Sequence, residues 1–150
     1  LVLEDPENSL IAVATQTGVM TALKAFHAST GRNLMISGEL CGPAIQGNAY
    51  KLPAVTWFVF DIFDVDAQEY LRPAARNECL QALSSMGFKP TVVPELEQFQ
   101  GAISLDALLT KAEGKSVVGI APEREGLVFK STLLNRSFKV ISNRFLEKEA

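Results

Sequence analysis

The sequence predicts an α+β fold in which mixed or antiparallel sheets are flanked by helices. Helix-like and strand-like segments both occur along the 150 residues, but not in the regular alternation that a doubly wound parallel sheet requires. The length suits a single domain with one core. Hydrophobic residues make up 47% of the chain and charged residues 21%, which is typical of a globular protein and not of a disordered or coiled-coil one.

The first predicted element is a long helix over residues 7–28. Asp5 offers an N-cap and Pro6 suits the first helical position, and apolar residues follow at mostly helical spacing. Thr30 and Gly31 end the helix, because glycine readily takes the left-handed conformation found after helices.

Two strands are predicted next, separated by a loop at 42–53 that holds glycines, prolines and an asparagine. Residues 33–41 alternate in polarity, which indicates a strand with Glu39 on its less apolar face. Its apolar side holds Leu34, Ile36 and Leu40, and its other side holds Met35, Ser37, Glu39 and Cys41. Residues 57–64 are rich in aromatic and β-branched side chains, so we expect a strand that is buried on both faces.

Two further helices are bounded by the residues that favour helix ends. Pro73 begins one and Gly87 follows its end, with Ala75, Cys79, Leu83 and Met86 on its apolar stripe. Ser104 caps a shorter helix that Gly114 terminates.

Closing strands are expected at 127–130 and 137–141, and Ser142 is placed to cap a last helix. From Glu123 to the end, six basic residues outnumber four acidic ones. Charge alone leaves two interpretations open for this segment, a solvated face and a phosphate-facing one.

Composition excludes several classes of function. The formal net charge of −3 argues against gripping nucleic acid by bulk charge alone. No apolar run approaches the roughly 18 residues that span a bilayer, and the N-terminus lacks the pattern of a signal peptide, so neither membrane insertion nor secretion is expected. Cys41, Cys79 and His27 cannot form the usual zinc cage, and a reducing, cytoplasmic compartment is the simplest interpretation.

Four segments of the sequence contain the motifs on which the predicted function depends. The first covers 38–48, the second 58–62, the third 125–130 and the fourth 137–143. They read GELCGPAIQGN, FVFDI, EGLVFK and SFKVISN. In this order they resemble motifs III, IIIa, IV and V of the ATP-dependent RNA ligases of the RNA ligase 2-like family, which belongs to the covalent nucleotidyltransferase superfamily.

The resemblance implies a partial adenylyltransferase domain of the ligase and capping-enzyme superfamily, with residues 1–150 as its C-terminal part, truncated upstream of residue 1. It also implies an enzyme that joins 5′-phosphate and 3′-hydroxyl RNA ends through lysyl-AMP and RNA-adenylate, in RNA repair or processing. ATP as the AMP donor and Mg²⁺ or Mn²⁺ are the expected cofactors, and a monomer is expected.

Three residues of the first two motifs are implied to bind the nucleotide. Glu39 would accept hydrogen bonds from ribose hydroxyls. Phe60 would stack on adenine, although an aromatic residue in an apolar strand is more often part of a core. Asp61 would lie on the opposite strand face from Phe60, and a carboxylate among apolar neighbours must be paired or solvated, which favours a site role.

The later motifs supply the catalytic and metal-binding residues that the resemblance implies. Glu125 would hold Mg²⁺ or Mn²⁺, while Lys130 and Lys139 would bind the nucleotide and neutralise phosphate charge in catalysis. Strand parity puts Glu125 and Lys130 on opposite faces, so both reach one site only if Glu125 precedes the strand or a bulge intervenes. Ile141 stands where the phage-type motif V has a second lysine, which puts contact to the α-phosphate on Lys139 alone or together with Lys130.

The nucleophilic lysine motif of the family has no match upstream of Glu39, where Lys24 is the only lysine. A formal Lys-x-x-Gly match begins at Lys111, but it follows motif IIIa and its glycine is explained as a helix terminator. The chain as given is therefore not expected to adenylylate itself. A non-catalytic module that binds a nucleotide or an RNA end, and a DNA ligase-like or capping-type nucleotidyltransferase, remain as alternatives.

Overall fold

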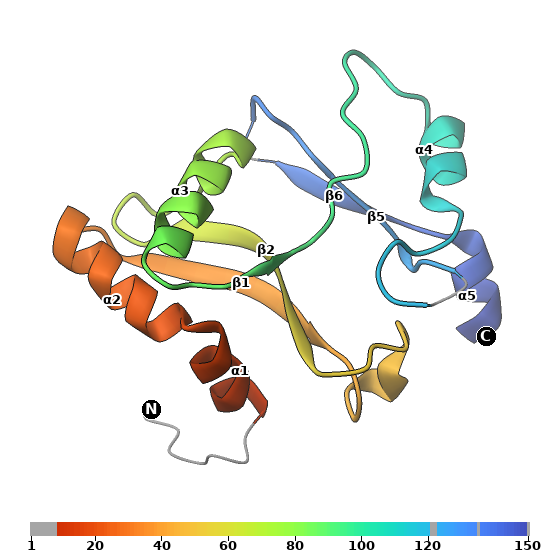
Figure 1. Ribbon diagram of the computed structural model, residues 1–150. Helices are drawn as coiled ribbons and strands as arrows, with labels where there is room; N and C mark the ends of the chain where they lie inside the picture. The colour runs from red at the N-terminus through yellow and green to blue at the C-terminus, as the bar shows by residue number, and fades with distance from the viewer. Residues whose placement is uncertain (1–8, 121–122, 135, 150) are drawn as a thin grey trace.

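The computed structural model describes residues 9–120, 123–134 and 136–149 (Figure 1). The α+β class is confirmed. Its helices are α1 (Ser9–Thr17), α2 (Val19–Thr30), α3 (Pro73–Ser85), α4 (Leu105–Ala112) and α5 (Asn143–Glu149), with a short 3₁₀ helix η1 at Gln46–Asn48. Its strands are β1 (Leu34–Cys41), β2 (Thr56–Asp64), β3 (Glu69–Tyr70), β4 (Thr91–Val92), β5 (Gly126–Lys130) and β6 (Ser137–Ile141).

The long N-terminal helix predicted over 7–28 is wrong as a single element, because it breaks at Gly18. This residue has a φ of 73°, and a Cβ at its position would lie 2.6 Å from the carbonyl oxygen of Gly87. The chain turns there so that the junction of α1 and α2 can pack on the turn after α3. The predicted end is confirmed, since the N–H of Gly31 donates to His27 O at 2.8 Å. The predicted cap at Asp5 and Pro6 lies outside the described residues.

No single helix of the described residues is long and apolar enough to cross a membrane. Within that part of the chain, α1 and α2 taken together reach the length and composition of a span, but they are bent by 56° at their break.

The larger sheet has four strands, with β2 at its centre. β1 and β3 pair antiparallel with β2, and β4 pairs parallel with it. β3 and β4 have two residues each and were not predicted, because so short a run carries no periodic signal. Glu39 lies opposite Phe58 in the register of β1 and β2.

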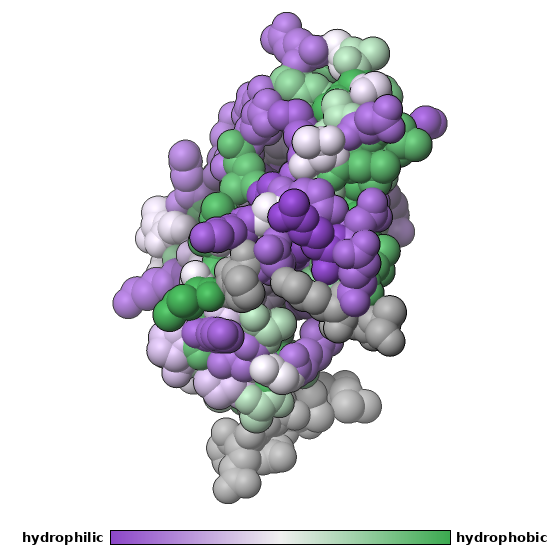
Figure 2. Space-filling model, turned by 90° about the vertical axis from the view of Figure 1, so that its right-hand side faces the viewer, coloured by the Kyte–Doolittle hydropathy of each residue, from purple (hydrophilic) through white to green (hydrophobic). Residues whose placement is uncertain are grey.

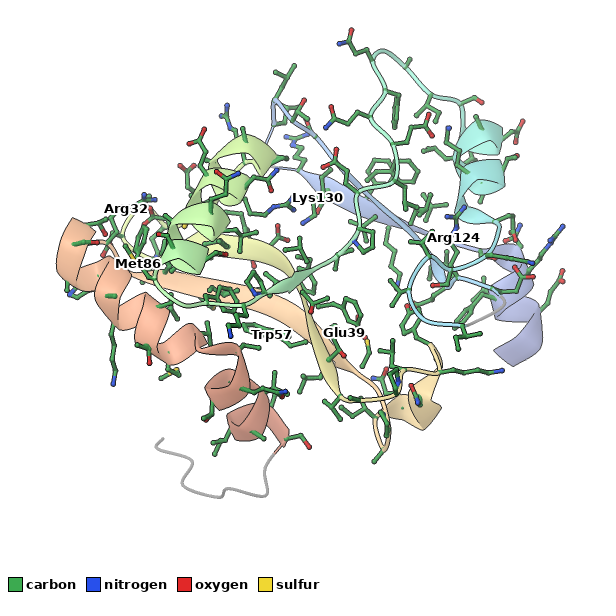
Figure 3. All side chains as sticks on the ribbon, in the orientation of Figure 1. Arg32, Glu39, Trp57, Met86, Arg124 and Lys130 are labelled. Atoms are coloured by element: carbon green, nitrogen blue, oxygen red, sulfur yellow. The ribbon has the colours of Figure 1, made fainter. Side chains whose placement is uncertain are left out.

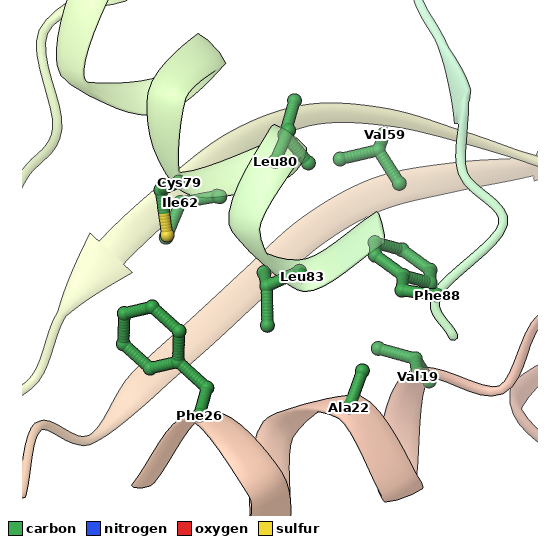
Figure 4. Packing of buried hydrophobic residues seen from close by; sticks show 9 residues of the cluster. All are labelled: Val19, Ala22, Phe26, Val59, Ile62, Cys79, Leu80, Leu83 and Phe88. Carbon is green, nitrogen blue, oxygen red and sulfur yellow. The ribbon is translucent and has the colours of Figure 1, made fainter. Parts of the chain in front are cut away.

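The core lies on one face of this sheet, under α2 and α3 (Figure 4). It contains Val19, Ala22, Phe26, Val59, Ile62, Cys79, Leu80, Leu83 and Phe88. The prediction that β2 is buried on both faces is wrong, because its full burial is confined to Val59, Ile62 and Asp64. On α3, Leu80 is buried whereas Ala75 of the predicted stripe is exposed.

The smaller sheet consists of β5 and β6, and α4 packs against it. Phe129 and Phe138 stack across the two strands with ring centroids 5.2 Å apart. Both predicted caps are confirmed: Ser104 Oγ accepts from Ala107 N at 3.3 Å, and Ser142 Oγ accepts from Phe145 N at 3.2 Å. Figure 2 views this side of the molecule, where hydrophobic residues are interspersed among hydrophilic ones.

Candidate functional site

A bulge in β2 brings two predicted site residues onto the same side of the larger sheet. Ser37 pairs with Asp61 but the next residue of β1, Gly38, pairs with Val59, so Phe60 has no partner in the register. Val59 and Ile62 are both buried in the core, and the two residues between them are not. The expectation that Asp61 and Phe60 lie on opposite strand faces is therefore corrected, because the extra residue resets the alternation.

Lys130 meets both of these residues from the other sheet. Its Nζ lies 2.6 Å from Asp61 Oδ1 and 3.0 Å from Phe60 O, and 5.8 Å from the centroid of the Phe60 ring. The side chains of Lys130 and Asp61 are each 25% exposed. Lys130 is labelled beside α3 in Figure 3, and its bonds to Phe60 O and Asp61 Oδ1 join β5 to β2. The structure thus places Lys130 beside the predicted adenine-stacking residue.

Arg76, which was not predicted as a site residue, reaches the same bulge from α3. Its Nη1 donates to Phe60 O at 3.0 Å. Arg76 belongs to none of the four motifs and its helix reads as a packing helix, so no local signal points to a site role. Only the fold brings it to β2.

The second pair of site residues is Glu125 and Lys139, whose side chains form an ion pair. Glu125 directly precedes β5, which confirms one of the two arrangements that strand parity allowed. Lys139 lies opposite Val128 in the register, and residues 128 and 130 share strand parity, so Lys139 and Lys130 lie on the same face of the smaller sheet. Both side chains of the pair are accessible, with 39% of Glu125 and 45% of Lys139 exposed.

The backbone around Glu125 is held by the ends of two helices. Ser142 N donates to Glu125 O at 2.8 Å. The guanidinium of Arg124 donates to the carbonyl oxygens of Lys111, Ala112 and Glu113, which end α4. Arg124 is the label beside α4 in Figure 3. A rigid anchor of this kind fixes where the Glu125 carboxylate can reach.

Glu113 joins the same two helix ends. Its carboxylate accepts from Ser142 Oγ and from Asn143 N, both at 2.8 Å. These bonds, led by the one from the Ser142 hydroxyl, hold the pKa of Glu113 below its usual value. The charged carboxylate therefore stabilises the start of α5.

Glu39 is exposed on β1, as the alternation predicts, and its carboxylate has no hydrogen-bond or ion-pair partner among the described residues. Tyr50 was not predicted. Burial raises the pKa of Tyr50, and the charges of Glu125, Cys41 and Glu39 raise it further. Tyr50 therefore lies within electrostatic range of Glu39 on β1 and of Glu125, which directly precedes β5. Its carbonyl oxygen accepts from Ile120 N at 3.0 Å, which fastens the loop after β1 to the segment before β5.

A pocket of about 390 Å³ lies elsewhere, between α1 and the two long strands. It is lined by Leu10, Ala14, Val19, Ile36, Ser37, Gly38, Leu40 and Trp57. None of the predicted site residues lines it, and its walls are mostly apolar, so it does not suit a phosphate-bearing ligand.

Comparison with known proteins identifies the family to which this chain belongs. The model of the RNA ligase family matches residues 4–141, nearly the whole chain. The chain belongs to the RNA ligase family. The Naegleria gruberi RNA ligase with PPi is 35% identical, with a TM-score of 0.87. A variant of that ligase with ATP and Mn is also 35% identical, with a TM-score of 0.88. A comparison with curated sequences gave no significant match.

The match to these RNA ligases covers 98% of this chain and 42% of theirs. The chain thus spans less than half the length of the solved ligases it matches. The side chain of Lys111, the formal nucleophile match, pairs with Glu97 Oε2 at 2.6 Å and with none of the predicted site residues in the described part of the chain. This placement agrees with a solvated lysine near a helix C-terminus.

The donors present fit a divalent cation that an RNA ligase would share with phosphate oxygens. Lys139 Nζ donates a hydrogen bond to Glu125 Oε1, so Oε2 of the same carboxylate is left to bind a cation. Among the described residues, no three His, Cys, Asp or Glu side chains gather as a metal cage. Mg²⁺ in particular is usually held by one or two carboxylates, water and substrate phosphates, so a single carboxylate is a suitable donor set.

Proposed function

We propose that the protein containing this chain is an ATP-dependent RNA ligase that joins 5′-phosphate and 3′-hydroxyl RNA ends through lysyl-AMP and RNA-adenylate. The observation that carries this proposal is the convergence of residues from three of the four motifs, those at 58–62, 125–130 and 137–143. Phe60 and Asp61 meet Lys130, and Lys139 meets Glu125, with both lysines on one face of the smaller sheet. Family membership supports the same conclusion.

The base of the nucleotide would bind at Phe60. The ring is only partly buried, and the bulge turns it away from the core, so a π-face is available for stacking on adenine. Lys130 holds the backbone of Phe60 and the carboxylate of Asp61. Glu39, whose carboxylate has no hydrogen-bond partner in the described part of the chain, would accept hydrogen bonds from the ribose hydroxyls.

The phosphates would bind at Lys139. Its ammonium is accessible and its carboxylate partner can turn to a metal ion instead, which would free the cation for phosphate. Mg²⁺ or Mn²⁺ held by Glu125 would supply positive charge to neutralise phosphate oxygens. Two solved variants of the Naegleria ligase carry changes at a glutamate and a lysine that are 14 positions apart, the separation of Glu125 and Lys139.

RNA repair or processing in the cytoplasm, by a monomer, is the role we propose for the protein. The acidic net charge of this chain limits non-specific binding of RNA, so contact with the RNA would depend on the ends being joined.

The test is ligation of a 5′-phosphate RNA end to a 3′-hydroxyl end by the full-length protein, with ATP and Mn²⁺. We expect joining by the wild type, a loss of several orders of magnitude in Lys139→Ala, and wild-type rates in Lys115→Ala, an exposed lysine outside the site. Equal joining by Lys139→Ala would contradict the assignment. Binding of AMP without covalent labelling or joining would indicate the alternative, a non-catalytic nucleotide-binding module.

A further inference from the structure

The edge of β2 that faces away from β1 has a gap in its pairing. β3 pairs with Phe63 and Asp64 at one end of β2, and β4 pairs with Phe58 and Val59 nearer the other. The bulge residue Phe60 lies between these two pairings, and it has no partner residue in β1 either. A partly buried carbonyl at such a point needs a donor from outside the ladder, since an unsatisfied backbone group destabilises the fold.

Two cationic side chains supply that donor. Arg76 Nη1 and Lys130 Nζ each donate to Phe60 O at 3.0 Å. The other two nitrogens of the Arg76 guanidinium donate to Asn77 Oδ1, Nε at 3.3 Å and Nη2 at 3.1 Å. The planar group is thus held on its far side by Asn77 while Nη1 binds the bulge. Hydrogen bonds from a charged donor are stronger than neutral ones, so the bond from Arg76 Nη1 to Phe60 O restrains the bulge strongly.

The two donors differ in what else they do. Lys130 also pairs with Asp61 at 2.6 Å, so a ligand that attracts the Asp61 carboxylate or the Lys130 ammonium would draw Lys130 from the bulge. Arg76 has no carboxylate partner in the described part of the chain. It is therefore the donor that stays on Phe60 O when Lys130 moves.

We propose that Arg76 is a positioning residue for Phe60: it fixes the bulge in β2 so that the aromatic ring faces the adenine base. The inference rests on the proposed function, since it takes Phe60 as the residue that stacks on adenine. Arg76 acts through the backbone of Phe60 and does not itself touch the nucleotide.

The first test measures the two ends of the nucleotide separately, by titrating adenosine and then pyrophosphate into the chain. In Arg76→Ala we expect about tenfold weaker adenosine binding, because Phe60 O then keeps only the Lys130 donor and the ring is held less firmly, and unchanged pyrophosphate binding. Arg76→Lys keeps a cationic donor and should recover part of the loss. Arg72→Ala is the control, because Arg72 is exposed at the start of the same helix and makes no side-chain cap.

The second test follows amide hydrogen exchange in residues 59–62 without any ligand. We expect faster exchange there in Arg76→Ala than in Arg72→Ala, at an unchanged unfolding temperature. If the wild type fails to bind adenosine while exchange responds as expected, the proposed function fails and the positioning of the bulge stands. Unchanged exchange and adenosine affinity in Arg76→Ala would overturn the inference. An equal loss of both ligands with a lower unfolding temperature would overturn it too.

Discussion

Lys130 and Asp61, 69 residues apart in the chain, form an ion pair of 2.6 Å that joins β5 to β2. The pair connects the two sheets at the bulge, so it fixes the smaller sheet relative to Phe60. Because each side chain keeps a quarter of its surface exposed, water screens the attraction only in part.

A double-mutant cycle measures this pair. Lys130→Met and Asp61→Asn should each lower the free energy of unfolding, and the coupling between them should be about 1 kcal/mol, the value typical of pairs near the surface that are well formed. Urea unfolding of the wild type, the two single variants and the double variant gives the coupling. A coupling near zero would show that the pair does not hold the sheets together.

Glu39 should matter for binding and not for stability. Its carboxylate has no partner among the described residues, so Glu39→Gln should change the free energy of unfolding by less than about 0.5 kcal/mol. The same substitution should weaken AMP binding by about 1–2 kcal/mol, because a charged acceptor for the ribose is lost. Calorimetric titration with Glu69→Gln as control, an exposed glutamate on β3, checks this. A similar loss in both variants would point to general electrostatics.

The break between α1 and α2 predicts different costs at two glycines of nearly equal φ. Gly18 has a φ of 73° and Gly31 a φ of 72°, so alanine at either position carries a backbone cost of about 1–2 kcal/mol. At Gly18 the added Cβ also lies 2.6 Å from Gly87 O, whereas at Gly31 nothing lies within 4 Å. Gly18→Ala should therefore destabilise the chain distinctly more than Gly31→Ala in urea unfolding. Equal effects would mean that the backbone at Gly87 shifts at little cost to make room for the added Cβ.

Acid should weaken the turn after β2, where Asp64 accepts hydrogen bonds from the backbone N–H groups of Asp66 and Ala67. Hydrogen bonds from the backbone N–H of Ala67 and from Arg32 hold the pKa of Asp64 below its ordinary value. A carboxyl whose pKa is lowered on folding contributes stability that is fully present above its unfolded pKa, about 4, and is lost as the pH falls through the folded pKa. Asp64→Asn should flatten the stability profile below about pH 4 and lower stability at neutral pH. Parallel wild-type and variant profiles below pH 4 would contradict this.

Local patterns predicted the elements whose signals lie within a few residues. Alternation placed Glu39 correctly on the open face of β1, and the caps at Ser104 and Ser142 follow from single side chains next to apolar runs. The position of Glu125 before β5 was one of two arrangements that parity allowed.

The features that were missed depend on contacts between distant segments. The helix break at Gly18 comes from packing against Gly87, and helical periodicity continues across it. The bulge at Phe60 exists only in the pairing of β2 with β1, while the aromatic run around it reads as a strand buried on both faces. Arg76 and Tyr50 approach the site through tertiary structure alone, so no motif marks them.

The most direct measurement of the central claim, that the motifs of this chain form a nucleotide site, is a calorimetric titration of AMP into the wild-type chain and Phe60→Ala. We expect saturable binding by the wild type and a loss of about 1–3 kcal/mol in Phe60→Ala, with the fold retained. No binding by the folded wild type, or equal affinity in the variant, would contradict it. Unfolding of Phe60→Ala would instead show that the ring supports the fold.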